Sequence, residues 1–185
     1  RKINDKIISQ QISKLERLPL RIDNISSHII ILESLKNEEF SDKNILHLIR
    51  LCNSNNINID VKYYTPTLLS YQDNLLVEDF FMTDFRNEHG IWKPFACVYI
   101  ANFNKSKYYN DILKYLVAGN WSFSDMLSRM ENSSPIFLNK LLNDSALINI
   151  ITLEIGKQIN EDFTTGFYTF KNPELEQILI ESEFW

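Results

Sequence analysis

Three charged residues in the first 62 positions could support metal-dependent chemistry. Glu33 ends a short apolar run, and Asp60 and Lys62 lie in a later one. If the two runs are neighbouring parallel strands, their carboxylates could hold Mg²⁺ at one sheet edge while Lys62 polarises a phosphate group. That chemistry belongs to a metal-dependent phosphodiesterase or nuclease. A cross-strand salt bridge explains the same residues, and a helix is expected between the two strands, so we expect neither a metal site nor catalysis here.

No established catalytic motif accompanies these residues. The chain has no phosphate-binding loop and no GxGxxG, GxSxG or HExxH pattern. We interpret His28, His47 and His89 as structural, because they fall at a strand start, beside the apolar stripe of a helix and in a turn. Cys52 and Cys97 have no CxxC partner or nearby histidine pair, which indicates buried, reduced thiols. The sequence therefore favours a protein without a cofactor, and a binding protein over an enzyme.

Residues 121–142 form a second candidate site, this time for nucleic acid. The spacing of their apolar residues resembles the helix-turn-helix of bacterial regulators. Asn139 and Lys140 are the residues that its second helix would offer to DNA. Leu127, however, occupies the position where a small residue normally lets the two helices cross, and nearby acidic residues leave the segment without a basic face. A plain helical hairpin is therefore the favoured interpretation, and nucleic-acid binding is the first alternative function.

The C-terminal segment is a third candidate, for docking on another protein. Residues 173–183 predict an acidic amphipathic helix, and the chain then ends in an aromatic pair. A partner's groove would contact the apolar members of this segment, which are Leu175, Ile178, Phe184 and Trp185. Packing of the segment against its own domain is the simpler explanation of the same pattern.

The elements expected to position these residues give an α/β (or α+β) fold in the first two thirds of the chain. A small mixed sheet flanked by helices is predicted there, with a hairpin link at 86–90. The expected strands are 28–33, 57–64, 75–85 and 92–101, and the expected helices are 2–18, one around 45–52 and one over 108–118.

The last third is expected to be helical. Helices are predicted at 123–130, at 135–142 and from Ser145 onwards, where an Ile-rich start also fits a strand. A short edge strand at 166–170 and the helix at 173–183 complete the prediction. We expect one domain over 1–185, with the best internal boundary at Gly119–Asn120, which separates an α/β part (1–118) from a mainly helical part (121–185).

The order of elements over residues 2–118 resembles half of a phospholipase-D-like domain. The resemblance is carried by the apolar run at 75–84, in which Asp79 stands where that family has an aspartate. The family precedes this strand with a His-x-Lys motif, and the matching stretch here is Tyr71-Gln72-Asp73-Asn74. The resemblance therefore implies a catalytically degenerate copy that lacks the nucleophilic histidine and the phosphate-binding lysine.

Composition sets the remaining expectations. The chain has 185 residues, 44% hydrophobic and 23% charged, with a net charge of −5, and no apolar run approaches the roughly 20 residues that cross a bilayer. Abundant Asn and Ile suggest an AT-rich genome, as in many microbes, mobile elements and viruses. We expect a soluble, intracellular (cytoplasmic), non-catalytic binding or regulatory protein that contacts another protein. Its start at Arg1 is also compatible with a missing targeting segment.

Overall fold

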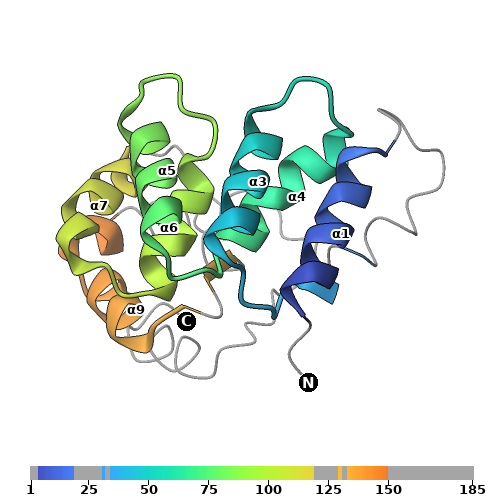
Figure 1. Ribbon diagram of the computed structural model, residues 1–185. Coiled ribbons are helices and arrows are strands. Elements are labelled where there is room, and N and C mark those ends of the chain that lie inside the picture. The colour runs from blue at the N-terminus through green and yellow to red at the C-terminus, as the bar shows by residue number, and fades with distance from the viewer. Residues whose placement is uncertain (1–3, 19–30, 32–33, 119–128, 131–132, 150–185) are drawn as a thin grey trace, which may run out of the picture. The chain divides into compact units, whose positions relative to one another are not determined.

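The computed structural model describes residues 4–18, 31, 34–118, 129–130 and 133–149, and throughout these residues the regular structure is helical (Figure 1). No strand occurs among them, so the predicted α/β (or α+β) fold with a small mixed sheet is wrong for this part of the chain. The elements are α1 (Asp5–Glu16), α3 (Asp42–Asn53), α4 (Ile59–Leu69), α5 (Leu75–Arg86), α6 (Lys93–Asn102), the 3-10 helix η1 (Ser106–Tyr108), α7 (Tyr109–Val117) and α9 (Pro135–Leu142).

The chain divides into two compact units. The first comprises Arg1–Tyr99 and the second Ile100–Trp185, so the division falls within α6. The first unit contains α1, α3, α4, α5 and most of α6, and the second contains η1, α7 and α9. The boundary predicted at Gly119–Asn120 lies outside the described residues.

The segment 75–85, predicted as the strongest strand, is helix α5. Its buried side chains are Val77, Glu78, Phe81 and Met82. The last three lie one, four and five positions after Val77, which is the spacing of one helix face and not the alternation of a strand. Asn74 begins the helix, because its side-chain oxygen accepts a hydrogen bond from the backbone N–H of Leu76 at 2.8 Å. The strand prediction is wrong because the apolar and aromatic content of the segment favours a strand, while the spacing of its buried residues is that of a helix.

The strands predicted at 57–64 and 92–101 are also helices, α4 and α6. In α6 every residue from Ala96 to Ala101 is buried, so the helix has no polar face in this stretch. A helix buried on all sides and a strand buried on both faces produce the same continuous apolar run. The residues at 86–90, predicted to link two strands of a hairpin, instead connect α5 to α6.

The helices predicted elsewhere in the described residues are present. Those expected at 2–18 and around 45–52 are α1 and α3, and that expected at 135–142 is α9. Residues 108–118 contain the end of η1 and α7. Residues 145–149 are helical, which agrees with the helix, and not the strand, that was predicted from Ser145 onwards. The predicted strand at 28–33 lies outside the described residues except for residue 31, which is helical, and residues 34–35 are helical as well. The elements predicted at 166–170 and 173–183, and most of that at 123–130, lie outside the described residues.

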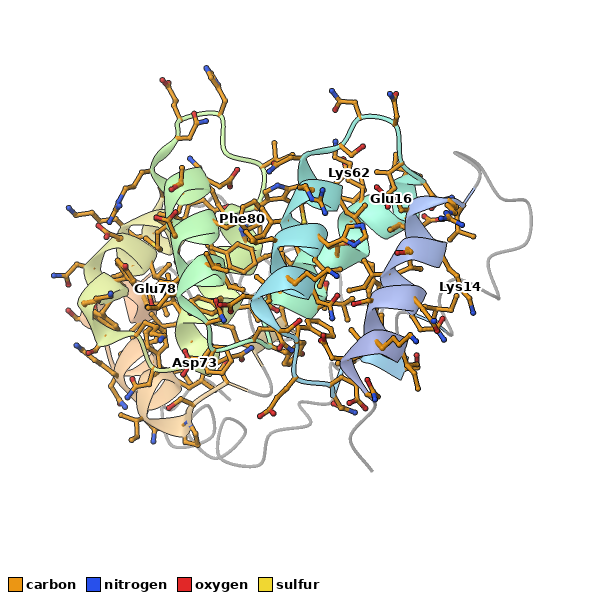
Figure 2. The ribbon with its side chains drawn as sticks, viewed as in Figure 1. Lys14, Glu16, Lys62, Asp73, Glu78 and Phe80 are labelled. Atoms are coloured by element: carbon orange, nitrogen blue, oxygen red, sulfur yellow. The ribbon has the colours of Figure 1, made fainter. Side chains whose placement is uncertain are left out.

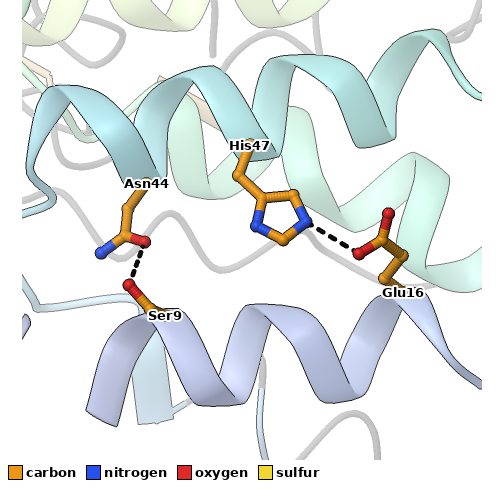
Figure 3. Close-up of polar contacts among 4 residues, drawn as sticks. All are labelled: Ser9, Glu16, Asn44 and His47. Carbon is orange, nitrogen blue, oxygen red and sulfur yellow. Dashed lines mark hydrogen bonds and ion pairs between the residues drawn. The ribbon is translucent and has the colours of Figure 1, made fainter. Parts of the chain in front are cut away.

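A polar seam joins α1 to α3 in the first unit (Figure 3). Asn44 is 1% exposed; its side-chain oxygen accepts a hydrogen bond from Ser9 Oγ at 2.7 Å, and its Nδ2 donates to Asp5 Oδ1 at 2.7 Å. Further along the seam, His47 Nε2 lies 3.0 Å from Glu16 Oε2. His47 therefore connects two helices, which agrees with its interpretation as a structural histidine.

Candidate functional site

The residues predicted for metal chemistry are not arranged as expected. Asp60 and Lys62 lie two positions apart on α4, and residues at this spacing point to different sides of a helix. Lys62 instead lies with its Nζ 3.4 Å from Asn55 Oδ1. Glu33 lies outside the described residues. Within the part of the chain that the structure describes, no group of three or more His, Cys, Asp or Glu side chains could hold a metal ion.

The candidates for nucleic-acid contact, Asn139 and Lys140, are exposed on α9 in the second unit. Lys140 Nζ lies 3.9 Å from the centroid of the Tyr109 ring, a cation–π contact that holds the ammonium group on α7. The Tyr109 hydroxyl lies 3.1 Å from both the carbonyl oxygen of Lys140 and a carboxylate oxygen of Asp144. Burial, with Asp144 adding to it, raises the pKa of Tyr109 to about 12. Lys140 thus joins α7 to α9, and residues 121–128 of the predicted DNA-binding hairpin lie outside the described residues.

The two cysteines are buried and free, as predicted. Burial raises the pKa of both the Cys52 and the Cys97 thiols well above the usual range. The thiolate is the reactive form of cysteine, so neither side chain is suited to act as a nucleophile or a metal ligand. The docking candidates Leu175, Ile178, Phe184 and Trp185 lie outside the described residues.

The strongest candidate site is an exposed apolar cluster on the first unit that sequence reasoning missed. Ile59, Tyr63 and Ile91 are 57%, 56% and 58% exposed. Ile59 and Tyr63 are four residues apart on α4, so they are neighbours on one face of that helix. The Tyr63 ring meets the Trp92 ring edge-on, with centroids 5.9 Å apart, and Ile91 directly precedes Trp92. We call this cluster of Ile59, Tyr63 and Ile91 the Tyr63 surface.

The loop that carries Ile91 is held in one conformation by Asp84 of α5. One carboxylate oxygen of Asp84 accepts a hydrogen bond from the backbone N–H of Ile91 at 3.2 Å, and the other accepts from the N–H of Trp92 at 2.8 Å. Gly90 passes so close to α5 that an added Cβ would lie 2.0 Å from the backbone oxygen of Asp84. Trp92 itself is 2% exposed, which anchors the end of the loop in the core. Ile91 is therefore presented to solvent by an ordered loop.

The helix that carries Ile59 and Tyr63 is equally well fixed. The Asn58 side chain caps α4 by accepting hydrogen bonds from the N–H groups of Asp60 and Val61, at 3.0 and 3.3 Å. The opposite face of α4 is fully buried through Val61, Leu68 and other residues. Both parts of the Tyr63 surface are ordered. Binding of a partner would therefore cost this chain little conformational entropy.

Two features of the sequence bear on this surface. The segment 57–69 has more apolar residues than one buried helix face requires, which is the signal that could have revealed Ile59 and Tyr63. The contact between Tyr63 and Trp92, in contrast, joins residues 29 positions apart and has no local signal.

No protein-family model matches the chain, and neither a curated protein nor a solved structure shows significant similarity to it. The resemblance of residues 2–118 to a phospholipase-D-like domain is not tested by these comparisons and stays a prediction. Among the residues that the structure describes, no helix combines the length and the apolar character needed to cross a membrane.

Proposed function

We propose that this chain is a non-catalytic interaction protein that binds a partner protein through the Tyr63 surface. The observation that carries the proposal is that the exposed Ile59 and Tyr63 share one face of α4, and that the Tyr63 ring contacts Trp92, which directly follows the exposed Ile91. Single exposed apolar side chains are ordinary on a protein surface, whereas clustered ones favour a binding site. An aromatic residue at the centre with aliphatic residues around it is typical of the anchoring part of protein interfaces.

Other exposed apolar residues of the chain provide the comparison. Leu75 at the start of α5 is 79% exposed, and Ile136 on α9 is 71% exposed. Neither belongs to the Tyr63 surface, so they represent the ordinary exposure that any soluble surface contains. Leu75 is therefore a suitable control position for an experiment on Tyr63.

Site-specific photocrosslinking tests the proposal. A benzophenone amino acid replaces Tyr63 in one variant and Leu75 in another, and each full-length protein is irradiated in extracts of the cells that express the gene. We expect a discrete adduct from position 63, absent from position 75 and strongly reduced by Ile59→Asp or Ile91→Asp. Identical adduct patterns at the two positions, or an adduct insensitive to both aspartates, would contradict the proposed function.

A further inference from the structure

We draw no further inference here: the strongest candidate, the exposed apolar patch of Ile59 and Tyr63 on α4, belongs to the site already described, and nothing in the structure shows what covers it, since Figure 2 labels both a cation, Lys62, and a carboxylate, Glu16, at the same end of the first unit.

Discussion

Replacing Asp84 with alanine should destabilise the first unit by about 2 kcal/mol. The change removes the two hydrogen bonds that the carboxylate accepts from the N–H groups of Ile91 and Trp92. A hydrogen bond to a charged group contributes roughly 1.5–3 kcal/mol when its loss leaves a buried donor, and less where water replaces the acceptor. The bond to Trp92 is part-buried and that to Ile91 is exposed, so the first should dominate the loss.

Urea unfolding followed by Trp92 fluorescence measures this loss. The chain has three tryptophans, so Trp121→Phe and Trp185→Phe leave Trp92 as the reporter of the first unit. With a slope of about 1.5 kcal/mol/M, the midpoint should fall by about 1.3 M. Asp84→Asn keeps one acceptor oxygen and should lose about half as much. The matched control is Asp79→Ala on the exposed side of the same helix; a loss in Asp84→Ala no larger than in this control would refute the role of Asp84 in holding the loop before α6.

Three further outcomes are expected. Asn44→Ala should cost about 2 kcal/mol, because it removes the bonds to Ser9 and Asp5, and faster hydrogen exchange in α1 would show it. Because the pKa of Tyr109 is raised in the folded state, the contribution of Tyr109 to stability is complete below about pH 10 and is lost as the pH rises towards 12. Urea midpoints followed by circular dichroism should therefore fall more steeply over this window in the unmodified protein than in Tyr109→Phe. No duplex DNA should bind at low salt; binding that Lys140→Glu abolishes would restore the nucleic-acid alternative.

The helical fold was predictable in part. The amphipathic α1, α3 and α9 were found from the period of their apolar residues, which is a local property of the sequence. For α4, α5 and α6 the period was obscured, because these helices bury much of their circumference or carry apolar residues beyond the buried face. Their β-branched and aromatic content then favoured strands.

The caps could have decided between the two interpretations. Asn58 and Asn74 each stand directly before a segment predicted as a strand or within its start, and each accepts hydrogen bonds from the first turn of the helix that follows. Asn is also common in the turns that precede strands, so its presence alone does not decide. The segments are longer than most strands, with 11 residues in α4 and 12 in α5. Their length together with the preceding Asn therefore favours a helix over a strand.

The candidate site was less predictable than the fold, because it depends on contacts between distant residues. Asp84 falls near the end of the strand predicted at 75–85, whereas in the folded chain its carboxylate binds backbone N–H groups seven and eight positions later. This contact helps to fix the loop that carries Ile91, and the contact of Trp92 with Tyr63 brings the residue after Ile91 against α4. A sequence pattern reports neither of these contacts.

The start of α6 links the stability of the first unit to its proposed binding role. The first helical turn leaves backbone N–H groups without intrahelical partners, and a cation at the first position adds to their positive field. The Asp84 carboxylate lies at this point, bound to the N–H of Trp92, and its negative charge offsets that field. The unit can therefore hold Lys93 at the helix start, two residues from the exposed Ile91, without losing the helix. The same carboxylate thus fixes the loop that carries Ile91, so loss of Asp84 should impair binding at the Tyr63 surface even under conditions where the unit remains folded.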